Sequence, residues 1–291
     1  MFEVSLLSTR DGILYTEYPR RSDLGPLLIS SWSFESIELE ENYRPFEQLA
    51  DGRTRVRILR TNPLLQVMLP EGGVGLVLNL GDRCRIGALT RAPGRVPRYF
   101  VVGPLTHPVR VRLGRTVRAL GMIADATLCE TLLGVRAAAL VDRITPLERY
   151  LGEWLPGFLA GADERSLGES ASALQQLIPR KFVQTRLDEV VQATALSIRA
   201  AQGAIRIAEL AAAQRVTRQY LGRAFREVTG FAPKEYARLV RFGALLRATL
   251  LRGPKDWASA AASLKLSDQA HLIREFRTYA GASPRRFLSQ E

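Results

Sequence analysis

The clearest hydrophobic pattern in the chain lies between Ile207 and Gly230. Apolar residues recur at helical spacing first over 207–211 and again at positions 221, 225 and 228. Thr217 stands between the two stripes, and its side-chain oxygen can cap a new helix. Gly230 can adopt the left-handed conformation that ends one. The pattern predicts two short helices joined by a tight turn, which is the layout of a helix-turn-helix unit.

The same pattern occurs a second time further along the chain. Residues 207–211 correspond to 257–261 at an offset of 50, and the second helix corresponds at an offset of 51. At that offset Gly230 aligns with Gly281. The features that recur in register are a cap, an apolar stripe, two arginines, a glycine and a proline. Their recurrence indicates an internal duplication of one unit.

A long helix is predicted between the two units. Pro233 can begin it, and one apolar face then continues to about Leu251. At ~1.5 Å per residue such a helix spans about 28 Å, close to one turn of DNA at roughly 34 Å. A rigid connector of this length could place two recognition helices in successive major grooves.

The beginning of the chain has a different pattern, made of short runs separated by glycine and proline turns. Apolar runs of strand length occupy 27–34, 74–80 and 99–102, and at 109–113 valine and leucine alternate with arginine. Many short strands with such turns favour a barrel or a sandwich over residues 1–122.

From Ile123 to about residue 183 the pattern is helical. Thr145-Pro146-Leu147-Glu148 has the form of a capping box that opens a helix. We expect Pro156-Gly157 to interrupt that helix, residues 161–172 to form a flexible junction, and 174–178 to form a further short helix. The predicted fold class is α+β, with a mainly β barrel or sandwich at 1–122, a helical connector at 123–183, and an all-α domain with two helix-turn-helix units at 184–291.

The charge of the chain is concentrated in the last of these parts. The 291 residues carry a net charge of +12, and from Arg199 onward there are 17 Lys and Arg against 7 Asp and Glu. A basic domain attached to a nearly neutral one indicates a polyanionic partner, with nucleic acid as the first candidate. A membrane surface is the competitor, but no basic amphipathic helix with a Trp, Phe or Leu face is present.

The exposed faces of the two second helices supply the candidate contact residues. Arginine can bond to guanine and glutamine to adenine in the major groove, so the base-reading candidates are Arg218, Gln219, Arg223, Gln269, His271 and Arg274. Phosphate candidates are Thr217, Tyr220, Arg226, Asp268 and Arg277. The competing interpretation is a pair of solvated helix faces, and the duplication and the charge favour DNA.

No pattern in the chain predicts catalysis, a metal or a cofactor. His107 and His271 are the only histidines, too few for a barrel metal site, and neither lies in a nucleophile motif. Cys84 and Cys129 have no metal or disulfide spacing and are expected to be buried thiols. No signal peptide and no membrane-spanning run is apparent, so a cytoplasmic protein is expected.

The C-terminal part resembles the DNA-binding domain of AraC/XylS-type transcription regulators. The motifs that carry the resemblance are IAELA at 207–211, VTRQYLGRAFREVTGFAPKEY at 216–236 and LSDQAHLIREFRTYAGASPRRF at 266–287. The resemblance implies a DNA-binding domain with two helix-turn-helix units. The chain departs from the family pattern in the second turn, which has Lys265 and Leu266 where the family favours a glycine and an aromatic residue, and Ala260 stands where the family has a larger aliphatic.

The N-terminal part resembles, more weakly, the small barrel of one subgroup of these regulators. YTEYP at 15–19, WSF at 32–34, LPEGG at 69–73, LVLNLGD at 76–82 and VVGPLTHPV at 101–109 carry this likeness. The subgroup has Pro-Asp-Gly where this chain has Pro70-Glu71-Gly72. Trp32, Phe34 and Trp154 are interpreted as core residues rather than a ligand cage.

These observations favour a sequence-specific transcription regulator and leave two alternatives. One is an architectural DNA binder with little sequence preference, and the other is an enzyme with a DNA-binding appendage. The expected partner is double-stranded DNA. A small-molecule effector in the N-terminal domain, a second copy of the chain and RNA polymerase are further candidates, and no cofactor is expected.

Overall fold

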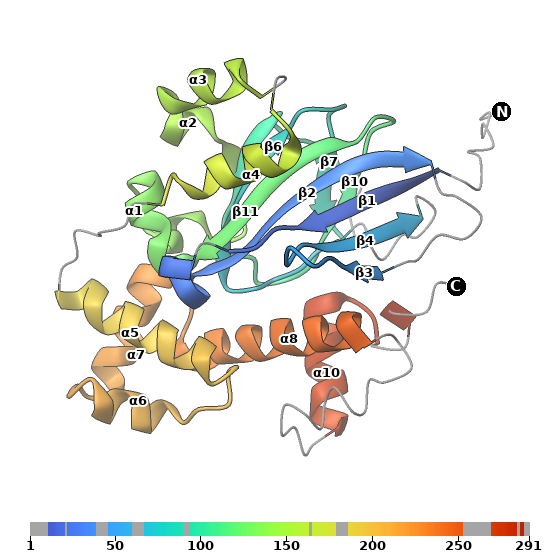
Figure 1. Ribbon diagram of the computed structural model, residues 1–291. Coiled ribbons are helices and arrows are strands. Elements are labelled where there is room, and N and C mark those ends of the chain that lie inside the picture. Colours follow the sequence, from blue (N-terminus) through green and yellow to red (C-terminus); the bar gives the residue numbers. More distant parts are fainter. Residues whose placement is uncertain are drawn as a thin grey trace.

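The computed structural model describes residues 11–20, 22–38, 46–59, 67–89, 93–162, 165–178, 186–252, 269–283 and 286–287. Strands dominate the N-terminal part of these ranges and helices the C-terminal part, so the predicted α+β class is confirmed. Figure 1 shows the sheets above a layer of helices, and α8 (Pro233–Arg252) runs beneath them.

Two antiparallel sheets form the β-rich part. The larger has the strand order β12-β9-β6-β11-β2-β1-β4-β3 and the smaller β5-β10-β7-β8. Their strands are β1 Asp11–Glu17, β2 Leu28–Glu38, β3 Phe46–Gln48, β4 Thr54–Leu59, β5 Val67–Met68, β6 Gly73–Asn79, β7 Arg85–Ala88, β8 Gly94–Arg95, β9 Tyr99–Val102, β10 Val109–Arg112, β11 Arg118–Asp125 and β12 Ile144–Pro146. Val77, Phe100 and Val109 belong to the apolar core that joins the two sheets.

Helices cover the other face of the larger sheet. They are η1 Ser22–Leu27, η2 Ala126–Leu128, α1 Cys129–Leu133, η3 Ala137–Leu140, α2 Glu148–Leu151, α3 Trp154–Ala160 and α4 Leu167–Gln175. Figure 1 shows α4 lying across β11 and β2. Leu120 and Met122 of β11 share one core cluster with Leu128 and Leu174. The segment expected to be a connector is therefore packed into the core of the N-terminal part.

The capping box expected at Thr145 is wrong. Residues 144–146 form β12, which pairs with β9 at the edge of the larger sheet. Pro146 fits an edge strand because it lacks an N–H for the sheet ladder. The helix that follows begins at Glu148 without a side-chain cap.

Two further expectations for this segment are wrong. Pro156-Gly157 does not interrupt a helix but lies within α3, where proline in the first turn removes no intrahelical hydrogen bond. The expected flexible junction over 161–172 contains the first part of α4, which is opened by a capping box between Ser166 and Glu169.

Five helices form the described C-terminal part. They are α5 Arg186–Ala200, α6 Ile207–Ala213, α7 Arg218–Thr229, α8 Pro233–Arg252 and α10 Gln269–Ala280. Tyr236 and Leu239 of α8 pack with Phe225 of α7, whereas Phe242 further along α8 packs with Phe276 of α10. Because α8 contributes to both cores, it ties the two units together. The domain boundaries proposed from the sequence stay predictions.

Candidate nucleic-acid interface

The first helix pair has the predicted form. Thr217 accepts a hydrogen bond from the Tyr220 N–H at 3.1 Å and so caps α7. Leu221 and Phe225 are fully buried, and Gly230 ends the helix at φ +85°. The cap, the apolar stripe and the terminal glycine are confirmed.

The turn between α6 and α7 contains a basic residue in a left-handed conformation. Arg215 has φ +54°, and the Val216 N–H donates to the Ala211 carbonyl at 3.0 Å. Lys265 corresponds to Arg215 at the offset of 50. A long basic side chain at this place is therefore a feature that the first unit already has, although Lys265 itself lies outside the described residues.

The outer face of α7 is basic and open to solvent. Arg218, Gln219, Arg223 and Arg226 are exposed, and the Arg223 guanidinium lies 6.0 Å from the centre of the half-buried Tyr220 ring. Among the described residues, no carboxylate pairs with any of these three arginines. Their positive charges are therefore available to bind an anion.

The second recognition helix repeats the first at an offset of 51. α7 and α10 are both 12 residues long, and Gly281 ends α10 at φ +73°. Arg274 and Arg277 are exposed, whereas Phe276 is buried. The segment 253–268, which includes Ala260, Leu266 and Asp268, lies outside the described residues. The side chains of Gln269 and His271 also lie outside them.

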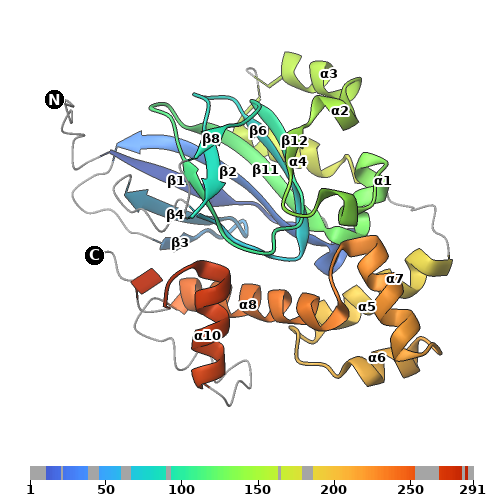
Figure 2. The ribbon, with the colours of Figure 1, turned by 180° about the vertical axis from the view of Figure 1, so that it is seen from behind.

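The connecting helix holds the two recognition helices apart. α8 has 20 residues, one more than predicted, which corresponds to about 30 Å. Figures 1 and 2 show α7 and α10 near opposite ends of α8. Tyr236, Leu239, Val240 and Leu246 of its predicted apolar face are buried.

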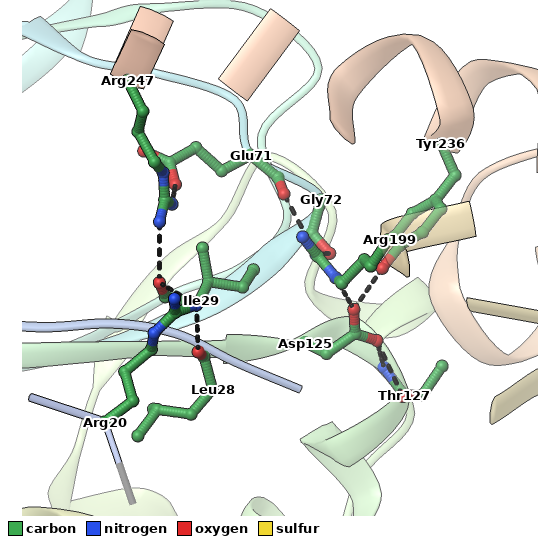
Figure 3. Close-up of polar contacts among 10 residues, drawn as sticks. All are labelled: Arg20, Leu28, Ile29, Glu71, Gly72, Asp125, Thr127, Arg199, Tyr236 and Arg247. Carbon is green, nitrogen blue, oxygen red and sulfur yellow. Dashed lines mark hydrogen bonds and ion pairs between the residues drawn. The ribbon is translucent and has the colours of Figure 1, made fainter. Parts of the chain in front are cut away.

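The C-terminal helices are joined to the N-terminal part through Asp125 at the end of β11 (Figure 3). Asp125 is fully buried, and one of its carboxylate oxygens accepts hydrogen bonds from Arg199 Nε and the Tyr236 hydroxyl. Its other oxygen accepts from the Thr127 N–H at 2.9 Å and the Thr127 hydroxyl at 2.7 Å. Two helices, α5 and α8, thus meet at one carboxylate.

Burial affects the two donors differently. It raises the pKa of the Tyr236 phenol well above its usual value, which keeps the hydroxyl protonated and able to donate. For Arg199, burial lowers the pKa, but the charge of the Asp125 carboxylate and its hydrogen bond with Arg199 outweigh this effect, so the net pKa is raised. The Arg199 guanidinium therefore remains a cation.

A second set of contacts joins α8 to the N-terminal part. Arg247 donates to the Ile29 carbonyl and to the Glu71 carboxylate, each at 3.1 Å, and Arg199 donates to the Glu71 and Gly72 carbonyls at 3.2 Å (Figure 3). Arg20 donates to the Leu28 carbonyl at 3.3 Å. Arg20, Arg199, Arg247 and Glu71 also line a cavity of about 270 Å³ between the two parts.

Both recognition helices end against the N-terminal part. A Cβ added at Gly230 would lie 2.3 Å from Val141 Cγ2, and one added at Gly281 would lie 2.3 Å from Leu89 Cδ1. An ion pair between Arg136 and Glu227 adds to the first of these contacts. The glycines that terminate the helices are thus also points of docking.

The interior of the β-rich part contains apolar space. A cavity of about 120 Å³ is lined by Trp32, Phe34, Cys84 and Phe100, among others, and a neighbouring one of about 210 Å³ shares Trp32 and Phe34. These two aromatic residues, expected in the core, both pack against it and line the cavities. Cys84 and Cys129 are buried free thiols, as predicted.

A helix-turn-helix unit, α6 and α7, together with a second exposed basic helix, α10, defines a DNA-binding protein of the class found among transcription regulators. Residues 210–290 match the helix-turn-helix domain family. The C-terminal part of the chain is thus a helix-turn-helix domain of the AraC type, as the sequence resemblance implied.

Solved structures give weaker likenesses. ToxT from Vibrio cholerae is 11% identical, with 76% of this chain and 91% of that chain covered and a TM-score of 0.43. Wild-type ToxT from strain SCE256 with bound unsaturated fatty acid is 10% identical, with 76% and 89% covered and a TM-score of 0.42. The AraC-like transcriptional activator CuxR is 14% identical, with 83% and 78% covered and a TM-score of 0.26. No curated protein matches the chain.

The described ranges contain neither a membrane-spanning helix nor a metal-binding cluster. No helix there is long and apolar enough to cross a bilayer. In the same ranges, no group of three or more His, Cys, Asp or Glu side chains is arranged to hold a metal ion.

The residues that join the two parts were missed by the sequence reasoning. Asp125, Arg199 and Tyr236 come from three distant segments, and no pattern in the sequence indicates that they meet. For Glu71 the sequence gives one signal, because the turn Pro70-Glu71-Gly72 has an acid where the related regulators also have one. Its acid bonds to Arg247, so the turn serves the contact between the two parts.

Proposed function

We propose that this protein is a sequence-specific transcription regulator that reads two successive major-groove segments with α7 and α10. The observation that carries the proposal is the pair of 12-residue helices at the ends of α8, each with exposed arginines. The length of α8, about 30 Å, is close to one turn of DNA at roughly 34 Å, which supports simultaneous insertion.

We assign base reading to Arg218, Gln219 and Arg223 on α7 and to Gln269, His271 and Arg274 on α10. Arg226 and Arg277 follow one turn later on the same helices and are assigned to phosphates, with Thr217, Tyr220 and Asp268 as further phosphate contacts. A bidentate arginine–guanine pair discriminates by about 1–3 kcal/mol.

Selection of bound sequences from a random duplex pool tests the proposal. A regulator enriches one motif with two parts about one helical turn apart, and random DNA competes poorly with it. An architectural binder enriches no motif, and random DNA competes equally well. The second outcome would contradict the proposal.

The N-terminal part is proposed to hold a small apolar effector between its sheets. The aromatic and aliphatic lining of the cavities around Trp32 and Phe34 supports an apolar ligand. The uncharged dye N-phenylnaphthylamine should fluoresce on binding there. Ala119→Phe, which fills the cavity, should abolish the signal, whereas the size-conserving Ala119→Ser should keep it. Contacts with a second copy of the chain and with RNA polymerase stay predictions.

A further inference from the structure

The smaller sheet has an unusual composition. Its strands β5, β10, β7 and β8 contain four arginines and no acidic residue. The arginines are Arg85, Arg95, Arg110 and Arg112, and all four are exposed. This part of the chain is nearly neutral as a whole, so the local concentration of charge needs a separate explanation.

The register of the strands places these side chains side by side. Arg112 lies directly opposite Arg85, which in turn lies directly opposite Arg95. Directly opposed residues have Cβ atoms about 4.5–5.5 Å apart. Arg110 is two residues along the same strand, about 6.6 Å from Arg112 and on the same face. Val109 and Ile86 point the other way, into the core between the sheets.

Such a row is unfavourable in the free protein. Like charges directly opposite each other destabilise a sheet, and among the described residues no carboxylate bonds to any of the four arginines. A row of guanidinium groups is suited to an anion with regularly spaced charges. Arginine in particular bonds to phosphate in bidentate geometry.

The strands that carry the row reach the second recognition helix at their other ends, three positions from Arg85 and Arg112. Gly281, at the end of α10, approaches Leu89, which directly follows β7, and Pro108, which directly precedes β10. The two central arginine-bearing strands thus have their ends at the point where α10 docks. Figure 2 shows β8 above α10, on the side that faces the viewer. This continuity favours DNA over an acidic protein as the occupant.

We propose that the outer face of the smaller sheet is a second DNA-contact surface, on which Arg85, Arg95, Arg110 and Arg112 bind the phosphate backbone of the duplex held by α7 and α10. This inference rests on the proposed function. It assigns part of the sequence-independent affinity for DNA to the N-terminal part, whose nearly neutral overall charge does not predict a DNA contact.

The test compares full-length variants on the duplex selected by the wild-type protein. Arg110→Gln/Arg112→Gln removes two positive charges from the face. Arg149→Glu changes the net charge by the same amount on α2, which lies at the top of both views, away from α7 and α10 (Figures 1 and 2). The affinity of each protein is measured over a series of salt concentrations.

The slope of log affinity against log salt should fall by about 1.8 for the double variant, since each phosphate contact contributes about 0.9. Over a fourfold range of salt this is roughly a twelvefold difference in the loss of affinity. Arg149→Glu should keep the wild-type slope. The free double variant should melt at the same temperature as the wild type or higher, because it has lost a repulsion.

An unchanged slope for the double variant would overturn the inference. If a labelled polyglutamate peptide then binds the wild type but not the double variant, the face serves an acidic protein instead. A wild-type protein with no sequence preference would contradict the proposed function itself, which the selection experiment detects separately.

Discussion

Replacing Arg199 with methionine should lower the free energy of unfolding by about 3–5 kcal/mol, because it leaves a carboxylate buried without its cation. The Asp125 side chain is 0% exposed and that of Arg199 is 9% exposed, so solvent screens the pair little. Methionine keeps most of the apolar stem of arginine, which limits the loss of packing.

The size of this loss of stability depends on which hydrogen bonds Asp125 and the neighbouring carbonyls lose when Arg199 is replaced. Asp125 keeps the hydrogen bonds from Thr127 and Tyr236, whereas the Glu71 and Gly72 carbonyls lose the donor on Arg199. Tyr236→Phe should cost less, about 1.5–3 kcal/mol, since it removes one hydrogen bond to a charged group. The Phe ring should retain the edge-on contact with Phe225, whose ring centre is 5.1 Å away.

Urea unfolding of Arg199→Met, Asp125→Asn and the double variant measures the pair as a cycle. The double variant should lose less stability than the sum of the single ones, with a coupling of about 0.5–3 kcal/mol. A cost below ~1 kcal/mol for Arg199→Met, together with no coupling, would refute the reasoning.

Four further predictions concern DNA binding and the buried thiol. The wild-type protein should show a steep slope of log affinity against log salt, since several phosphate contacts contribute about 0.9 each; a flat slope would remove the electrostatic argument. Residues 184–291 alone should fold and bind DNA, as circular dichroism and gel shift can show, whereas an unfolded fragment would contradict the partition. Arg223→Ala and Arg274→Ala should each cost about 1–3 kcal/mol and relax preference at one place, while Arg226→Ala should weaken all sequences alike. Arg223→Ala should reduce sequence preference more than Arg274→Ala, because α7 has Gln219 beside its arginines where α10 has Ala270. Equal losses of preference in the two variants would show that this ranking is wrong. Burial raises the pKa of Cys129 from 9.0 to about 12, so a thiol reagent at pH 8 should react with this thiol only on unfolding. Because the unfolded thiol loses its proton at lower pH than the native one, the free energy of unfolding should fall as pH rises from 9 toward 12. Rapid reaction of the native thiol would contradict this prediction.

The helix-turn-helix units could be predicted because their signals are local. Thr217 caps a helix three residues away, and Gly230 ends it through its own backbone conformation. The apolar stripe between them repeats at a period that one short segment reveals. For the same reason the exposure of Arg223 and Arg274 follows from the sequence.

The docking of the two parts could not be predicted, because its partners are far apart. Arg199 and Asp125 are separated by 74 positions, and Tyr236 and Asp125 by 111. Each is an ordinary polar residue in its own element, and only the folded chain brings them together. β12 was missed for a similar reason, since a three-residue strand is defined by its partner β9 rather than by its own pattern.

The length of α8 restricts how this protein can evolve. One inserted residue would advance α10 by about 1.5 Å and rotate it by roughly 100°. Arg274 would then point in a different direction, and Gly281 would move away from Leu89. If α7 and α10 read DNA as proposed, substitutions on them change the recognised sequence gradually, whereas the spacing between the two parts of that sequence changes only in large steps. An insertion of seven residues, close to two full turns, would add about 10.5 Å and restore the phase, which corresponds to roughly three base pairs.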